Sequence, residues 1–330
     1  MFAAAGDLTA QGMNQQRQQG PAPPSSTRRW LLAGAVIALL AALAVQVLRS
    51  PDEIQYFRRL SASILALTLF VQFLSQLLYN SALLLPLRTH MKGLGYWEFF
   101  MVRTGGFLLG HIVPVAGGIA VRLAYLRGRG LNYRDFTWAT LLSNVAALLA
   151  SAVLAVAATG ILWMVIAPPP ALVLGLSTSV LALSVAVLWL FQSLPNLASH
   201  SWFHRWPWIS GMSGFTASRQ TMGRVFVLSL ARHSLNFVTF GLLYQSLSRS
   251  ASGFLTGGLV YALTSPLRMV QITPGNLGIN EWVSAIVGTI LAFDVTTGLI
   301  VALVFRGVSL LAQGLGVLFG WAWLAGWRKP

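Results

Sequence analysis

The sequence has no cysteine and few acidic residues. None of its 330 residues is Cys, and only 7 are Asp or Glu. The absence of cysteine excludes disulfide bonds and thiol chemistry, and it removes any indication of the redox compartment. Most of the acids are placed as loop, tail or segment-start residues (Asp7, Asp52, Glu53, Glu98, Asp135 and Asp294). Glu281 is the one that remains within apolar sequence.

Recognisable catalytic motifs are missing as well. The sequence contains no HExxH metalloprotease motif, no GxSxG nucleophile elbow and no phosphate-cradling glycine loop before a lysine. His200 and His204 are spaced like two metal ligands, but three tryptophans and no acid surround them. We therefore expect a protein without catalytic residues, metal or cofactor, and we interpret 192–224 as an interfacial segment.

Apolar residues dominate the composition. They make up 56% of the chain against 9% charged residues, and the mean hydropathy is +0.70. These values indicate an all-α polytopic membrane protein. The net charge is +15, but the basic residues flank apolar runs. Anionic headgroups and topology explain that pattern better than nucleic acid.

Six apolar runs are long enough to predict full membrane spans. A polar, disordered cytoplasmic tail over 1–28 precedes a membrane domain over 29–330. Gln72, Gln76 and Asn80 share one face of the second span, where we expect interhelical hydrogen bonds. The predicted spans are 30–48, 62–87, 136–159, 171–191, 225–247 and 297–324.

The chain is organised around a break at 271–281, QITPGNLGINE. Pro274 removes a backbone donor, and Gly275 and Gly278 weaken helix further, between apolar segments 254–270 and 282–293. Such a break at membrane depth is tolerated where protein or a water-filled cavity surrounds it, and Glu281 beside it is a candidate functional residue. The alternative is an ordinary loop with a capping carboxylate.

An upstream copy of this break lies at 111–122, HIVPVAGGIAVR. Superimposing Pro114 on Pro274 also places Gly118 on Gly278, and 77–81 matches 242–246 at nearly the same offset. Two repeats, about 30–167 and 171–325, are therefore predicted, joined through 192–224. Gly117 and Gly118 open the segment after the first break, and Gly106 and Gly110 form a small-residue face for close helix packing.

Charge distribution favours an arrangement in which each broken pair enters and leaves on one side. Thirteen basic residues then lie on the side of both termini against four on the other, whereas single crossings would give eight against nine. The first count obeys the positive-inside rule and places both termini in the cytoplasm. It yields two inverted repeats, each with three full spans and a re-entrant pair. The thirteen are Arg17, Arg28, Arg29, Arg88, Lys92, Arg127, Arg129, Arg134, Arg205, Arg219, Arg224, Arg328 and Lys329, and the four are Arg49, Arg58, Arg59 and Arg249.

These motifs resemble the lysylphosphatidylglycerol synthase transmembrane region, also called the flippase-like domain. The similarity rests on 272–281, on 113–122 and on Arg306, about 25 residues after the second motif. Asn276 stands where the family commonly has Gly, and Ala120 lacks the acid that often precedes Arg122 by two positions. The resemblance implies a bacterial cytoplasmic membrane protein that moves a lipid or lipid-linked headgroup. Because the chain ends six residues after the last predicted span, we expect no synthase domain.

We hypothesise that Arg122, Glu281 and Arg306 line a common polar cavity where the hairpin tips meet. Arg268 is a weaker member, Asn276 and Asn280 are added as polar neighbours, and Arg103 is expected to snorkel. In this hypothesis Arg122 binds the phosphate of an anionic phospholipid or lipid-linked substrate. The alternative is a Glu281–Arg306 pair that only fixes the fold. At the level of function, the alternative is a non-transporting partner of a separately encoded lipid- or glycosyl-transferase.

The topology can be tested by labelling. The chain has no native cysteine, so a cysteine introduced beside Arg129 is the only thiol. We expect it to react with maleimide reagents only after the cytoplasmic side is exposed. Reaction with a membrane-impermeant reagent from the outside alone would contradict the inverted arrangement.

Overall fold

The computed structural model describes residues 60–89, 91, 93–112, 117–166, 168–198, 218–248, 252–269 and 276–327. Within these ranges the chain is helix and short connections, without a strand. The order is α4 (Ala62–Arg88), α5 (Tyr96–Ile112), α6 (Gly117–Gly128), α7 (Tyr133–Val165), α8 (Ala171–Ala198), α10 (Arg219–Ser248), α11 (Gly253–Thr264), the 3₁₀ helix η3 (Ser265–Met269), α12 (Ile279–Ile290) and α13 (Val295–Trp327).

Five of these helices are long and apolar enough to cross a membrane: α4, α7, α8, α10 and α13. A 27-residue helix such as α4 is about 40 Å long, which exceeds the roughly 30 Å hydrocarbon core. Five of the six predicted spans are thereby confirmed, and the sixth, 30–48, lies outside the described residues. Helix α8 continues to Ala198 and α10 begins at Arg219. Both helices therefore extend into the polar segment 192–224, because helical hydrogen bonding continues beyond the apolar stretch.

The four short helices α5, α6, α11 and α12 form the two broken pairs. They have 17, 12, 12 and 12 residues, or about 18–26 Å, so none crosses the bilayer alone. Pro114, Pro274 and Gly275 of the predicted breaks lie outside the described residues, whereas Gly117 is the first residue of α6.

The first pair is a hairpin whose open ends meet. Glu98, in the first turn of α5, accepts hydrogen bonds from Tyr125 and Arg129 at the end of α6. Further along, Gly106 lies against Gly118: a Cβ on Gly106 would come 2.7 Å from the Gly118 carbonyl oxygen. This contact confirms the predicted close packing of the small-residue face.

The second pair closes in a similar way around Tyr244 of α10. A Cβ added to Gly257 of α11 would meet Tyr244 Cβ at 2.4 Å, and one added to Gly288 of α12 would lie 3.0 Å from the Tyr244 hydroxyl. The start of α11 and the end of α12 are therefore gathered at one residue. The turn between them lies at the far end of the pair.

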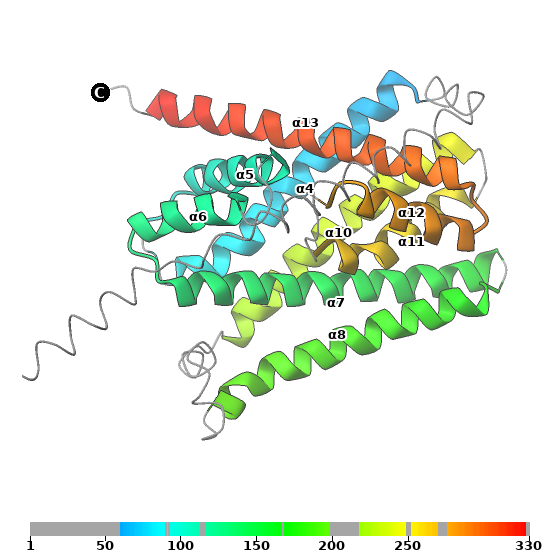
Figure 1. The fold of residues 1–330 in the computed structure, drawn as a ribbon, viewed down its shortest axis with the longest axis horizontal. Helices are drawn as coiled ribbons and strands as arrows, with labels where there is room; N and C mark the ends of the chain where they lie inside the picture. The colour runs from blue at the N-terminus through cyan, green and yellow to red at the C-terminus, as the bar shows by residue number, and fades with distance from the viewer. Residues whose placement is uncertain are drawn as a thin grey trace, which may run out of the picture.

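Helices α4 and α10 cross at the centre of the molecule and run antiparallel. Ser75 donates to Asn236 Oδ1 at 3.0 Å, and Arg232 stacks on the ring of Tyr79. The chain thus advances from residue 75 to 79 along α4 while the contacted residue on α10 moves back from 236 to 232, as expected for antiparallel helices. Figure 1 shows these helices running diagonally between α13 and α7, with α5 and α6 toward one end and α11 and α12 toward the other.

The order of helices occurs twice. A long helix, two short ones and a long one follow each other as α4 to α7 and again as α10 to α13, while α8 packs on α7. This repeated order is the one expected from the predicted duplication. The repeat boundaries themselves remain a prediction.

The Gly106–Gly118 contact can be tested with neighbouring glycines. We expect Gly106→Ala to destabilise the protein by about 1–3 kcal/mol, because the methyl group meets the Gly118 backbone carbonyl as well as the stem of Arg122. Gly105→Ala is the matched control, since no atom lies within 4 Å of its added Cβ. Thermal unfolding of the detergent-purified protein measures both. Equal melting temperatures for the two variants would contradict the close contact.

Candidate functional site

The second break ends in a turn that only a few residue types adopt. Asn276 has φ of 52° and Gly278 has φ of 81°, both in the left-handed region. Glycine enters this region freely, and asparagine is among the few other residues that tolerate it. This backbone explains why asparagine can stand at 276, where the resemblance described above led us to expect glycine.

Glu281 holds this turn against helix α12. Its Oε2 accepts a hydrogen bond from the Gly278 backbone N–H at 2.7 Å, at the helix N-terminus. The carboxylate therefore satisfies a free amide and interacts favourably with the helix dipole. The residue is only 2% exposed, so its charge requires a partner within the protein.

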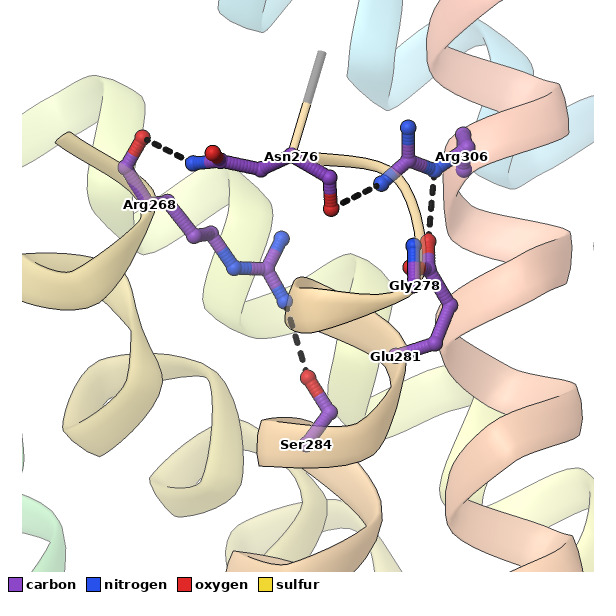
Figure 2. A network of polar contacts seen from close by, with 6 residues as sticks. All are labelled: Arg268, Asn276, Gly278, Glu281, Ser284 and Arg306. Atoms are coloured by element: carbon purple, nitrogen blue, oxygen red, sulfur yellow. Dashed lines mark hydrogen bonds and ion pairs between the residues drawn. The ribbon is translucent and has the colours of Figure 1, made fainter. Parts of the chain in front are cut away.

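That partner is Arg306 from helix α13. Its Nε donates to Glu281 Oε1 at 2.5 Å, and its Nη2 donates to the Asn276 carbonyl oxygen at 3.1 Å. One guanidinium thus binds both the turn and the carboxylate that caps it, as Figure 2 shows. The pairing anticipated from the 25-residue spacing is present.

Arg268 approaches the same turn from η3. Its Nη2 donates to the Ser284 hydroxyl at 3.3 Å, and its carbonyl oxygen accepts from Asn276 Nδ2 at 3.4 Å (Figure 2). Aromatic rings surround the guanidinium and offer it cation–π contacts. The Arg268 Cζ atom lies 4.8, 5.3 and 5.1 Å from the ring centroids of Phe240, Tyr261 and Phe305, respectively.

A second group of guanidiniums gathers around Tyr79 in the other half of the molecule. The Cζ atoms of Arg232 and Arg103 lie 3.7 and 4.6 Å from the Tyr79 ring centroid. The Tyr79 hydroxyl is also within electrostatic reach of Arg122. We call Tyr79, Arg103, Arg122 and Arg232 the Tyr79 cluster. The two stacked guanidiniums are at most about 8 Å apart, where like charges repel by about 2 kcal/mol.

Arg103 contradicts the expectation that it snorkels. It is only 1% exposed, and its Nη2 donates to Gln76 Oε1 at 3.1 Å and to the Gln76 carbonyl oxygen at 3.3 Å. Helix α5 packs against α4 and α13, and the guanidinium is bonded to α4 instead of extending to the interface. The Gln76 contact confirms that the polar face of α4 bonds between helices.

Arg122 belongs to the first hairpin. Its Nε donates to the Gly118 carbonyl oxygen one turn earlier at 3.2 Å, and its stem packs where a Cβ on Gly106 would lie. The side chain is partly buried. The structure thus places Arg122 with Tyr79 and places Glu281 with Arg306. The common cavity that joins all three stays a prediction.

Polar residues connect the two groups. Asn236 of α10 donates to the Tyr261 hydroxyl at 2.9 Å, and that hydroxyl lies 2.9 Å from His233 Nδ1. His233 is within electrostatic reach of both Arg232 and Arg268. Because Asn236 also contacts Ser75, which lies one helical turn before Tyr79 on α4, a buried polar row runs from beside the Tyr79 cluster toward Arg268.

The arginines of the described residues fall into two classes. Six are exposed and lie at or beside helix ends: Arg88, Arg127, Arg129, Arg134, Arg219 and Arg224. Five are buried or partly buried: Arg103, Arg122, Arg232, Arg268 and Arg306. By the same measure three carboxylates are buried or partly buried, Glu98, Asp135 and Glu281, and the first two lie in the first turns of α5 and α7. The interior therefore carries an excess of positive charge.

The sequence-based candidates include some members of this row and omit others. Asn280 lies partly buried at the second residue of α12, next to Glu281. Tyr79, Arg232 and His233 were overlooked. Arg232 and His233 interrupt the apolar run 225–247, and an ionisable residue within a span is the signal that could have identified them.

Comparison with known proteins gives one family. The family model described as lysylphosphatidylglycerol synthase TM region matches residues 30–316. No curated protein and no solved structure shows significant similarity to the chain.

The Glu281–Arg306 pair can be tested with a double-mutant cycle. We expect Glu281→Gln and Arg306→Gln each to lower the unfolding free energy by about 3–5 kcal/mol, because each leaves an uncompensated buried charge. The double variant should lose less than the sum of the two. Thermal unfolding in detergent provides the readout. Arg129→Gln, which breaks an ion pair whose arginine is exposed, is the control and should change little; strictly additive losses at 281 and 306 would argue against the pair.

Proposed function

The chain belongs to the lysylphosphatidylglycerol synthase TM region family, and we propose that it is a flippase-like protein that translocates a phospholipid or lipid-linked headgroup between leaflets. The observation that carries this proposal is the excess of buried or partly buried guanidiniums over carboxylates among the described residues, five against three. Burying a charge near the bilayer centre costs about 2.5–3.5 kcal/mol on insertion scales. An anionic headgroup that enters the row would recover part of that cost.

A lipid is the substrate class that this setting supports. The guanidiniums lie on helices long enough to span a membrane or on the short helices between them. Anions at that depth come attached to lipids, because a free anion would first have to leave water. Arginine binds phosphate with two parallel hydrogen bonds, which suits a phosphate-bearing headgroup.

An inverted arrangement of the two halves follows from the same proposal. The first hairpin opens beside the C-terminal half of α4, where Tyr96 donates to the Leu77 carbonyl oxygen. The second opens beside Tyr244, in the C-terminal half of α10. Since α4 and α10 run antiparallel, the hairpins open toward opposite ends. Opposed hairpins that meet at a central polar row are typical of transporters with inverted repeats.

The exposed arginines support the proposed orientation. Arg88 ends α4 and Arg219 begins α10, so the antiparallel crossing brings them to the same end of the molecule. The open end of the first hairpin, with Arg127 and Arg129, lies there too. By the positive-inside rule this end is cytoplasmic. We accordingly propose a bacterial cytoplasmic-membrane protein with both termini inside.

The alternative is a membrane partner of a separately encoded transferase. The description of the family includes a synthase, and a transferase acting on lipids would benefit from a subunit that presents its substrate. Such a partner would bind the headgroup without moving it. A transport measurement separates the two.

The proposal is tested by lipid translocation in vesicles. Purified protein is reconstituted with a fluorescent anionic phospholipid, and chemical quenching from outside measures exchange between leaflets. We expect the wild type to accelerate exchange and both Arg122→Gln and Glu281→Gln to reduce it about tenfold or more. The first removes a phosphate-binding cation, and the second removes the carboxylate that holds Arg306 and the turn at Gly278.

Arg127→Gln is the matched control for the first variant, because it removes an exposed arginine from the same helix. Melting temperatures are compared before transport is interpreted. Full activity in both well-folded site variants would refute the assigned residues. A wild type that binds lipid but leaves exchange at the protein-free rate would favour the partner role.

A further inference from the structure

We propose that the Tyr79 cluster binds a headgroup with more than one negative charge, a phosphomonoester or a diphosphate, and that the Glu281 turn does not. The inference rests on the proposed function only in taking the anion to be attached to a lipid.

Among the described residues, no carboxylate contacts the two arginines that stack on Tyr79. The described arginines within electrostatic reach of Arg103 are Arg122 and Arg232, both of the same sign. Of the four described acids, Glu98 contacts Arg129 and Glu281 contacts Arg306, and Asp135 and Asp294 lie near the starts of α7 and α13. Mutual repulsion without a counter-charge is a strain that an anion relieves.

Unused donors remain in the cluster. The Nε atoms of Arg103 and Arg232 are buried, and no hydrogen-bond partner is present for them among the described residues. Arg103 itself is 1% exposed, which makes a missing acceptor costly. Arg122 and Arg232 are partly exposed, so a ligand can reach the cluster from outside the packed helices.

The Glu281 turn differs because it contains a carboxylate. Arg306 binds Glu281 and a carbonyl oxygen, and Arg268, whose Nε also has no hydrogen-bond partner among the described residues, is within electrostatic reach of Glu281. Part of the positive charge of the turn is thereby offset within the protein. The need for an anion is greatest around Tyr79.

The number of charges indicates the class of headgroup. Two guanidiniums stack on the Tyr79 ring and a third, that of Arg122, lies within electrostatic reach of Tyr79. A single phosphodiester carries one negative charge, which leaves two of them uncompensated. A terminal phosphate or a diphosphate supplies more charge and more acceptor oxygens for the forked donors. Such headgroups should therefore bind more tightly than phosphatidylglycerol.

Binding is measured on the purified full-length chain in neutral detergent, through the rise in melting temperature with added ligand. The ligands are a polyprenyl diphosphate, phosphatidylglycerol, phosphatidylcholine and inorganic pyrophosphate. We expect the diphosphate lipid to bind about tenfold more tightly than phosphatidylglycerol, and phosphatidylcholine to have no effect. Equal affinities for the two anionic lipids would overturn the assigned class, and pyrophosphate as effective as the lipid would overturn the lipid attachment.

Variants of helix α10 locate the site. Arg232→Gln should reduce affinity for the diphosphate lipid about tenfold while leaving the ligand-free melting temperature unchanged or higher, because it relieves repulsion. Arg224→Gln, an exposed arginine on the same helix, should change neither. Arg232→Lys keeps the charge without the forked geometry, and should also bind more weakly.

A purely structural role for Arg232 would appear as a lower ligand-free melting temperature with unchanged affinity, and would overturn the inference. The vesicle assay keeps the two proposals apart. Binding lost in Arg232→Gln without any translocation by the wild type contradicts only the transport proposal. Translocation by the wild type with unchanged binding in Arg232→Gln contradicts only the site.

Discussion

The constraint on which this structure depends is the cost of holding guanidiniums among apolar helices. Five arginines lie buried or partly buried in the described residues, against three carboxylates, of which Glu281 binds Arg306. Each charge near the centre of a bilayer costs several kcal/mol unless something compensates it. The chain compensates by three means: aromatic faces beside Arg103, Arg232 and Arg268, backbone oxygens beside Arg122 and Arg306, and a carboxylate at Glu281 alone. Apolar groups in these places would often be as stable or more stable, which is why we propose that the arginines bind a ligand.

The two halves use this chemistry differently. In the second half the left-handed backbone at Asn276 and Gly278 presents a free amide to Glu281, and Glu281 in turn fixes Arg306 on α13. The break is thereby tied to a spanning helix. In the first half, contact between Gly106 and Gly118 draws the hairpin together and directs Arg122 toward Tyr79, where no acid balances it. Asn236, Tyr261 and His233 join the halves through hydrogen bonds at the crossing of α4 and α10. The Glu281 turn thus balances part of its charge with a carboxylate, whereas the positive charge of the Tyr79 cluster has no such partner among the described residues.

The sequence predicts the helices well and the contacts between them only in part. Apolar runs locate five spans because a helix in lipid must satisfy its own backbone, and Pro and Gly locate the breaks for the same reason. The Glu281–Arg306 pair could be predicted from the sequence, because Glu281 is the one acid within apolar sequence and an intramembrane arginine follows it in the next span. Arg103 was misjudged, since burial depends on α4 and α13 covering α5, which the residues around 103 do not encode. Tyr79 and Arg232 meet only where two antiparallel helices cross, and no local pattern reports a crossing.

The central claim is that the buried positive charge is there to bind the phosphate of a lipid. The most direct test measures phosphorus per protein molecule after exhaustive detergent exchange of the purified chain, in the wild type and in a variant with Arg103 and Arg232 both replaced by Gln. The account predicts stoichiometric phosphorus in the wild type and a large loss in the folded variant. Equal phosphorus in both proteins, or none in either, would contradict it.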